Sequence, residues 1–214
     1  MRIRTAATAL MATALLTAGA AAPAPVQAAE KRLGNRSLAT VLTSDGNRFD
    51  RNPRDYDIVT EAVLAVLAAK PDSPVGVLAD GKTPVTAFIP NDWSFKRLVK
   101  DLTGTKPRSE KATFNALVAA VGVDAIEQVL LYHVVPGVTI DKRTAVRSDG
   151  ASLTTAQGGA ITVDVIYRRL PLVQLGDLDP DATDPFLDPF ALDINKGNKQ
   201  IAHGIYLVLR PLDL

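Results

Sequence analysis

The chain has 214 residues, of which 47% are hydrophobic and 22% are charged, and it contains no cysteine. This balance is typical of a globular domain, and the absence of cysteine excludes disulfides, thiolate metal sites and a thiol nucleophile. Lysine and arginine number 24 against 23 acids, so the overall charge gives no argument for binding nucleic acid or an anionic membrane.

The N-terminal residues carry the pattern of a secretory signal peptide. Arg2 and Arg4 form a positive start, residues 6–22 are an apolar run of small side chains, and Val26-Gln27-Ala28 fits a cleavage site. The predicted divisions are a signal peptide at 1–28, a leader at 29–36 and a domain at 37–214. Loss of both arginines leaves 22 basic residues against 23 acids, a net charge of −1. We therefore expect a secreted, soluble protein with no segment long enough to span a membrane.

Helical spacing of apolar side chains dominates the first part of the predicted domain. Ser37 caps a short predicted helix, and Asp57 caps a longer one that Pro71 ends. A connector then reaches Pro84, after which residues 86–92 predict a strand running into the start of a helix.

Ser109 opens a further predicted helix, which Gly122 breaks, and the capping box at 124–127 begins a short helix. That helix leads into residues 130–137, Leu-Leu-Tyr-His-Val-Val-Pro-Gly, which carry one of the two histidines of the chain. A short apolar run closed by Pro-Gly is typical of a buried strand, and we predict one here.

Beyond Gly137 the spacing changes from helical to alternating, which is typical of strands. The predicted elements are a hairpin at 153–165 around Gly158-Gly159, a strand at 167–175, an aspartate- and proline-rich loop at 177–189, and a last strand at 200–209. Helices followed by strands predict an α+β fold rather than repeated β-α-β units.

Three segments, in this order, resemble the fasciclin (FAS1) family. They are Thr86-Ala87-Phe88-Ile89-Pro90-Asn91-Asp92 with Phe95, then Tyr132-His133 with Val134-Val135-Pro136-Gly137, and then Gln200-Ile201-Ala202-His203-Gly204-Ile205. Together they cover residues 37–212, nearly all of the mature chain. The resemblance implies a FAS1-like wedge of two β-sheets with several helices packed around it, and an extracellular adhesion or matrix role without catalysis. It also implies structural roles for Phe88, Pro90, Asn91 and Phe95.

Some features depart from the family pattern. The connectors at 71–84 and 177–189 are longer than a minimal family member needs, and Trp93 stands where the family usually carries a small or polar residue. The chain has no Arg-Gly-Asp triplet. Integrin binding is therefore not inferred from the resemblance.

The two histidines, His133 and His203, admit catalytic, metal-binding and structural interpretations. Neither has a carboxylate or second histidine at helical ligand spacing, and no nucleophile-elbow or zinc-protease motif occurs. We therefore interpret both as hydrogen-bonded structural side chains and predict no catalytic residue. The resemblance implies that His133 links its strand to neighbouring backbone and that Tyr132 fills core or interface. The same pair is a candidate partner-binding surface.

The aspartates of the loop at 177–189 are a weak candidate for a calcium site, and no other metal or cofactor is predicted. The candidate ligands are Asp177, Asp179, Asp181, Asp184 and Asp188. Their alternation fits a calcium-binding loop, but Ala182 stands at the sixth place, where the sharp turn needs glycine. Because prolines also stiffen this segment, a solvated loop without metal is the favoured interpretation.

Two further groups are candidate partner-binding residues. Trp93, the only tryptophan, either packs under the preceding connector or is an exposed anchor for a glycan or protein, since binding hot spots favour indole. Tyr167, Arg168 and Arg169 form either a ligand patch or a solvated strand face.

These patterns favour a secreted, non-catalytic interaction module that binds an extracellular protein or polysaccharide and mediates adhesion, matrix or envelope binding. No nucleic-acid partner, membrane insertion or cofactor is predicted. The alternative is a polysaccharide- or small-ligand-binding protein that is assisted by calcium at the aspartate loop. A secreted hydrolase is disfavoured, because no catalytic motif occurs.

Overall fold

A computed structural model describes residues 32–44, 46 and 49–212 of the chain. The chain divides into two units after Arg32, and the described helices and strands all belong to the second unit, Leu33–Leu214. The predicted signal peptide at 1–28 lies outside the described residues, as do the first residues of the predicted leader.

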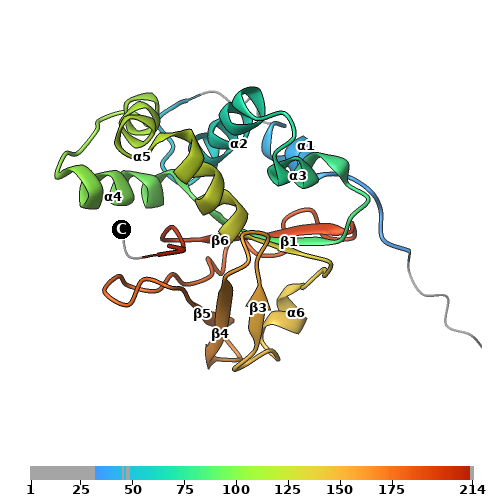
Figure 1. The fold of residues 1–214 in the computed structure, drawn as a ribbon. Helices are drawn as coiled ribbons and strands as arrows, with labels where there is room; N and C mark the ends of the chain where they lie inside the picture. Colours follow the sequence, from blue (N-terminus) through green and yellow to red (C-terminus); the bar gives the residue numbers. More distant parts are fainter. Residues whose placement is uncertain (1–31, 45, 47–48, 213–214) are drawn as a thin grey trace, which may run out of the picture. The chain divides into compact units, whose positions relative to one another are not determined.

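The second unit is an α+β domain, as the sequence predicts, and its described strands form two three-stranded sheets (Figure 1). Its helices are α1 (Leu38–Leu42), α2 (Asp57–Ala69), the 3₁₀-helix η1 (Pro74–Gly76), α3 (Val77–Asp80), α4 (Asp92–Thr103), α5 (Glu110–Tyr132) and α6 (Lys142–Ala145). Its strands are β1 (Val85–Pro90), β2 (Val134–Pro136), β3 (Ser152–Thr154), β4 (Ala160–Tyr167), β5 (Leu172–Gly176) and β6 (Gln200–Ile205).

The first sheet has the order β2-β1-β6, with β1 in the centre. Strand β1 pairs antiparallel with β2 and parallel with β6, and its register places Phe88 opposite His203. Every residue of β1 and β6 is buried, because both faces of this sheet are covered. The second sheet, β3-β4-β5, is antiparallel throughout.

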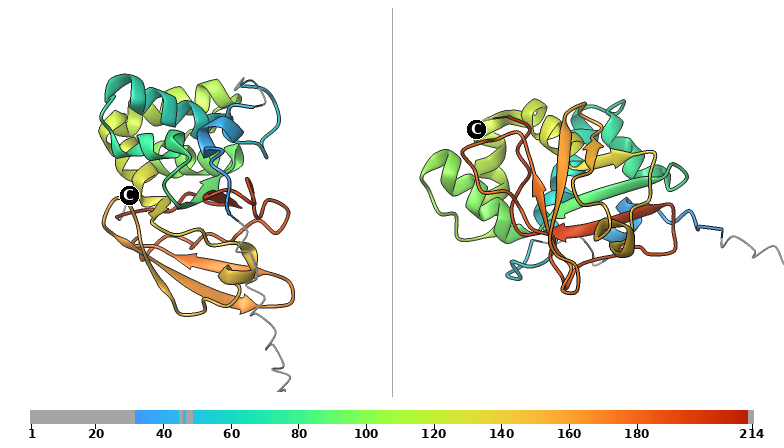
Figure 2. Two further views of the ribbon diagram at one scale, coloured as in Figure 1. Left: turned by 90° about the vertical axis from the view of Figure 1, so that its right-hand side faces the viewer. Right: turned by 90° about the horizontal axis from the view of Figure 1, so that it is seen from below.

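Two hydrophobic cores lie on opposite faces of the first sheet. Because side chains alternate along a strand, Val85, Ala87 and Ile89 pack against the helices, whereas Phe88 packs against the second sheet. The core on that second face also contains Tyr132 at the end of α5. The first sheet is therefore the middle layer between the helices α1 to α5 and the second sheet (Figure 2).

The stretch at 130–137 differs from its prediction as one strand. Residues up to Tyr132 are the last turn of α5, His133 is its C-cap, and only β2 is extended. The helix continues to Tyr132 because Leu130 and Leu131 keep the spacing of the helical core face, and no glycine or proline lies between Gly122 and Pro136. The predicted break at Gly122 is confirmed, since this residue has φ 76° and ψ 169° within α5.

Other boundaries also differ from the predictions. The connector at 71–84 contains the short helices η1 and α3. The strand predicted at 167–175 begins only at Leu172, because the residues before it turn between β4 and β5, and the last strand ends at Ile205. Asp57 is the first residue of α2 rather than its cap, since Tyr56 occupies the cap position without a side-chain hydrogen bond.

Among the described residues, α5 is long and apolar enough to cross a membrane by length and composition alone, which the sequence analysis did not expect. The helix is interrupted at Gly122, however, and it contributes Leu117, Ile126 and Leu130 to the core beside the first sheet. Core helices commonly pass such a test, so α5 is explained by its packing in the domain.

Candidate functional site

Helix α4 is fixed at its N-terminus by buried polar side chains. Asn91, at the N-cap, accepts hydrogen bonds from the backbone N–H of Ser94 at 3.1 Å and from its hydroxyl at 2.9 Å. Asp92, the first helical residue, is buried and accepts from the backbone N–H of Ile58 at 2.9 Å. The sequence predicts this helix start, and Phe88, Pro90 and Phe95, to which the family resemblance assigns structural roles, are all buried.

Three side chains of α4 form an exposed stripe opposite its buried face. Trp93, Arg97 and Lys100 stand at positions i, i+4 and i+7, which share one side of a helix. Trp93 is 43% exposed, and the guanidinium carbon of Arg97 lies 5.1 Å from the centroid of its ring, a cation–π distance. Trp93 is therefore exposed rather than packed under the preceding connector, and its role as an anchor for a partner stays a prediction.

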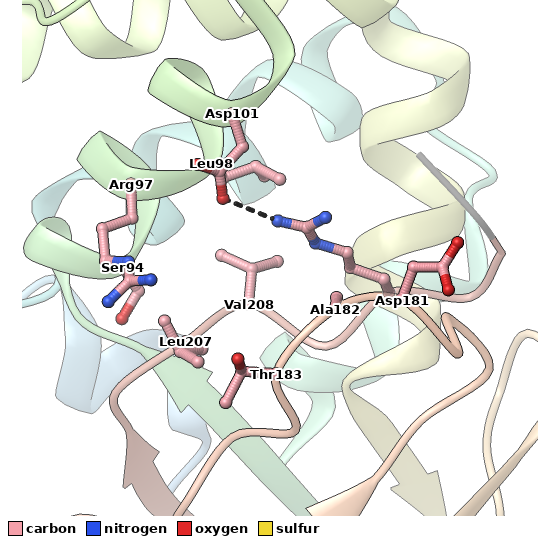
Figure 3. Close-up of a pocket in the computed structure, with 10 residues that line it drawn as sticks. Ser94, Arg97, Leu98, Asp101, Asp181, Ala182, Thr183, Leu207 and Val208 are labelled. Atoms are coloured by element: carbon pink, nitrogen blue, oxygen red, sulfur yellow. Dashed lines mark hydrogen bonds and ion pairs between the residues drawn. The ribbon is translucent and has the colours of Figure 1, made fainter.

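A hollow of about 300 Å³ lies on one side of the stripe, between α4, the loop at 181–183 and the C-terminal segment (Figure 3). Arg210 ties these three parts together. Its Nη2 donates to Oδ2 of Asp101 on α4 at 3.0 Å, and its Nη1 donates to Oδ2 of Asp179 in the loop at 3.2 Å. Ser94 and Arg97 extend from α4 towards this hollow, which has a mixed polar and apolar lining.

A second hollow, of about 510 Å³, lies on the other side of Arg97 and is strongly basic. Its aromatic and cationic side chains are Trp93, Lys96, Arg97, Lys100 and Lys106, which we call the α4 face. The two hollows share Arg97 and Asp101 in their linings, so they are neighbours along the helix. An exposed indole surrounded by four cations is an arrangement that can bind a partner with apolar and anionic groups.

The sequence indicates Trp93 as a candidate, whereas the four cations of the α4 face are not among the predicted site residues. The signal was present, because Arg97 and Lys100 follow Trp93 at helical spacing, and residues 96–111 hold six cations against two acids. The total charge of the chain does not reveal this local excess of positive charge, because basic and acidic residues are nearly equal in number over the entire chain.

His133 is buried, and both of its ring nitrogens hydrogen-bond to backbone groups. Nε2 accepts from the N–H of Leu209 at 3.0 Å, so the ring proton is on Nδ1, which donates to the carbonyl of Val129 at 2.7 Å. Burial lowers the pKa of His133 to about 4, and the ring is neutral near pH 7. The imidazole ties the end of α5 to the C-terminal segment and has no nitrogen left for a substrate or a metal.

Tyr132 has no exposed surface, and its hydroxyl donates to the carbonyl of Ala160 on β4 at 2.7 Å. This residue and His133 therefore connect the helical layer to the second sheet and the C-terminal segment. The candidate partner-binding surface at Tyr132 and His133 is wrong, because neither side chain reaches the outside of the domain.

His203 is also fully buried and saturated by backbone groups. Its Nδ1 accepts from the N–H of Asp193 at 3.3 Å, and its Nε2 donates to the carbonyl of Ile140 at 2.8 Å. Burial is the main cause of its lowered pKa. The two histidines bond to different segments, so they do not form an acid–base pair or a shared metal site.

The loop at 177–189 uses its carboxylates to fix its own path. Asp179 is only 3% exposed, and its Oδ1 accepts from the N–H groups of Asp181 and Ala182, each at 3.2 Å. Its other oxygen accepts from Arg210. The interpretation of a merely solvated loop is therefore corrected at Asp179, because a buried carboxylate needs these partners.

Three of the remaining calcium candidates, Asp177, Asp184 and Asp188, also accept hydrogen bonds from the chain. Asp177 accepts from the backbone N–H of Arg210 at 2.8 Å, and Asp188 accepts from the hydroxyl of Tyr206 at 2.8 Å. In the described part of the chain, no three of the predicted ligands bring carboxylate oxygens within 4.8 Å of one another. Two other groups of carboxylates do meet this distance. One is Asp50, Asp55 and Asp57, and the other is Asp55, Asp92 and Glu110.

Both sequence and fold relate this chain to known proteins. The model of the Fasciclin domain family matches residues 61–173, just over half of the chain. The chain belongs to the fasciclin domain family. Tyr132, His133 and the start of α4 all lie within the matched region, whereas β6 with His203 lies beyond it.

Among solved structures, this fasciclin domain resembles the FAS1 domain pair of the insect cell adhesion molecule fasciclin I, with a TM-score of 0.50 and 15% identity. The likeness covers 74% of this chain and 48% of that one, so the chain spans about half the length of the pair. At this identity the likeness concerns the fold alone. No curated protein matches the chain.

The candidate patch at Tyr167 lies on the second sheet of the fasciclin domain. Tyr167 is 51% exposed at the end of β4, and Arg168 and Arg169 follow in the turn to β5. The two arginines border a hollow of about 370 Å³, together with Lys142, Arg143 and Lys196. This basic hollow shares no lining residue with the α4 face.

A buried carboxyl cluster at the start of α4 is a feature of this fasciclin domain that the sequence did not predict. Asp55, Asp92 and Glu110 each place a carboxylate oxygen within 4.8 Å of the other two. Glu110 accepts from the N–H of Asp50 at 2.6 Å and pairs with Nζ of Lys96 at 3.2 Å. Burial, supported by a hydrogen bond with Asp55, raises the pKa of Asp92 to about 9. A proton on Asp92 therefore offsets part of the negative charge of the cluster.

Replacing Asp92 with asparagine is expected to reduce the dependence of stability on pH. Because the folded pKa lies above the unfolded value, folding takes up a proton, and the stability gained is lost as the pH rises towards about 9. The side-chain oxygen of asparagine can still accept from the N–H of Ile58, and its amide N–H groups replace the proton carried by the carboxyl group of Asp92. The difference in free energy of unfolding between Asp92→Asn and the wild type, measured in urea, should shift by about 1–3 kcal/mol in favour of the variant between pH 5 and pH 8. The same pH slope in both proteins would contradict the assignment.

Proposed function

We propose that this fasciclin domain is a secreted, non-catalytic interaction module that mediates adhesion by binding a partner of the extracellular matrix or cell envelope. The observation that carries the proposal is the α4 face. Trp93 is exposed beside Arg97 on a helix whose first turn is held by buried hydrogen bonds. A rigid aromatic anchor with cations around it suits binding, because little conformational entropy is lost when a partner docks.

Two further observations support a binding role over a catalytic one. The rings of His133 and His203 are buried, and all four nitrogens are engaged by backbone groups. General acid–base catalysis needs a titrating group within reach of a substrate proton, which neither ring offers. The fold is shared with a FAS1 domain pair from a molecule described as a cell adhesion molecule, and this also supports an adhesion role.

Calcium is not part of the proposal. Asp177, Asp179 and Asp188 already accept hydrogen bonds from the chain, and they do not converge. The alternative class, a polysaccharide-binding protein, differs from the proposal only in its partner. The exposed indole favours it, because sugar rings stack on aromatic faces.

The proposal is tested by retention of the purified protein on immobilised envelope and matrix fractions. Trp93→Ala should weaken retention about tenfold, since a central aromatic anchor commonly contributes at least that factor. Tyr167→Ala is the matched control, because it removes an exposed aromatic ring of the second sheet. Both variants should unfold at the temperature of the wild type. Equal retention of the wild type and Trp93→Ala, or an equal loss for Tyr167→Ala, would contradict the proposal.

A further inference from the structure

Positive charge is concentrated around α4. Residues 96–111 contain six lysines or arginines and two acids, a net charge of +4, whereas the entire chain carries +1. The rest of the protein is therefore acidic on balance. A local excess of one sign on such a background attracts a polyanion to this surface in particular, rather than to the domain as a whole.

Most of this charge is available to a partner. In the described structure, Lys96 is the one cation of the α4 face that forms a salt bridge, with Glu110. Arg97 lies over the ring of Trp93, and Lys100 and Lys106 are exposed. Cations that stand close together repel one another, so an anion that binds between them gains from relief of that repulsion as well as from direct attraction.

The shape of the α4 face adds a second requirement for its partner. The hollow of about 510 Å³ is large enough for a sugar residue, and the hollow of about 300 Å³ adjoins it at Arg97. The indole of Trp93 offers an apolar surface to a ring, while Arg97 offers a planar fork that matches a carboxylate. The partner therefore needs flat, partly apolar rings that carry anionic groups at short intervals.

We propose that the partner of the α4 face is an acidic polysaccharide whose sugar rings carry carboxylates. A sugar ring packs on the part of the Trp93 indole that Arg97 leaves exposed, its carboxylate pairs with Arg97, and the carboxylates of neighbouring rings pair with Lys100 and Lys106. This inference rests on the proposed function, because it names the partner of the same surface.

Polyphosphates and nucleic acids fit the same surface less well. Single-stranded nucleic acids are held by several aromatic platforms in a basic groove, whereas the α4 face has one aromatic residue. Polyphosphate has no ring to pack on the indole, so Trp93 would add nothing to its binding. Polyphosphate is therefore included in the test as a comparison polymer.

The test is calorimetric titration of the protein with polygalacturonate, with the same polymer after reduction of its carboxylates to alcohols, and with polyphosphate. Polygalacturonate should bind, and its affinity should fall about tenfold between 50 and 200 mM salt, as expected when a few ion pairs form. The reduced polymer and polyphosphate should each bind at least tenfold more weakly. Binding of either as tight as that of polygalacturonate would overturn the proposal.

Paired charge variants locate the site. Lys100→Gln with Lys106→Gln removes two exposed cations of the α4 face and should weaken polygalacturonate binding about tenfold. Arg168→Gln with Arg169→Gln removes the same charge from the other basic hollow and should change the affinity less than twofold. If both double variants lose the same affinity for polygalacturonate, the polymer is attracted by the overall charge and not by the α4 face, and the proposal is overturned.

Failure of this proposal is distinct from failure of the proposed function. Retention on envelope or matrix material that depends on Trp93, but is not competed by polygalacturonate, overturns only the acidic polysaccharide as partner. Absence of any retention overturns the proposed function.

Discussion

Replacing His133 with alanine is expected to lower the free energy of unfolding by about 3 kcal/mol. The imidazole accepts from the N–H of Leu209 and donates to the carbonyl of Val129, and both His133 and Leu209 are buried. The substitution leaves the buried N–H of Leu209 without its partner, leaves the carbonyl of Val129 with only the backbone N–H of residue 133, and opens a cavity between α5 and the C-terminal segment. Urea unfolding followed by circular dichroism measures the loss.

His133→Gln is the matched variant for this prediction. The side-chain oxygen of glutamine can reach the position of Nε2 and accept from Leu209, so this variant should lose roughly half as much stability as His133→Ala. A His133→Ala protein with the stability of the wild type, but without binding to envelope material, would show that the structural role given to His133 is wrong.

Replacing Arg210 with methionine is expected to cost about 3 kcal/mol of stability, chiefly because it strands a buried carboxylate. The side chain of Asp179 is 2% exposed, and Arg210 is its cationic partner. Methionine keeps an apolar stem of similar length, so the change isolates the charge and its hydrogen bonds. The loop at 177–189 should also become more susceptible to proteolysis, since Arg210 fastens it to α4.

Two further variants separate the contributions to this effect. Asp101 has a side chain that is 44% exposed, so Asp101→Asn should cost less than about 1 kcal/mol. Asp179→Asn in the Arg210→Met background should recover about 1–2 kcal/mol, because the amide still accepts from Asp181 and Ala182 without carrying a charge. A loss for Asp101→Asn as large as that for Arg210→Met, or no recovery in the double variant, would refute this account.

The sequence was sufficient to predict the parts of the fold that depend on local pattern. The strand-to-helix segment around Asn91 and the break at Gly122 are as predicted, because a cap and a glycine act through their immediate neighbours. The end of α5 was mistaken for a strand, since a short apolar run such as that at 130–132 fits either element. What decided between them was the helical core that Leu130 and Leu131 join.

The candidate site was predicted only in part, for a different physical reason. Trp93 could be singled out by its chemistry, but its exposure depends on how α4 packs in the fold. The cluster of Asp55, Asp92 and Glu110 was invisible in the sequence, because its members are far apart in the chain and only the fold brings them together. Tyr132 and His133 formed a conspicuous motif, yet their burial makes them a tie within the domain.

The near-zero net charge did not predict the basic surface on α4, because net charge is a property of the whole chain. A net charge near zero disfavours long-range attraction to a polyanion, but it is compatible with a strongly basic surface on α4. Such surfaces could be found from sequence by summing charge over windows of about one helix length and its following loop, and by checking for aromatic residues at helical spacing.

Collisional quenching of tryptophan fluorescence by acrylamide tests most directly whether the α4 face is the binding surface. Trp93 is the only tryptophan, so all of the signal reports on this face. Free protein should be quenched readily, because the residue is 43% exposed. Bound to envelope or matrix polymer, the protein should be quenched several-fold less if the account is right. Undiminished quenching of protein that is demonstrably bound would show that the partner lies elsewhere.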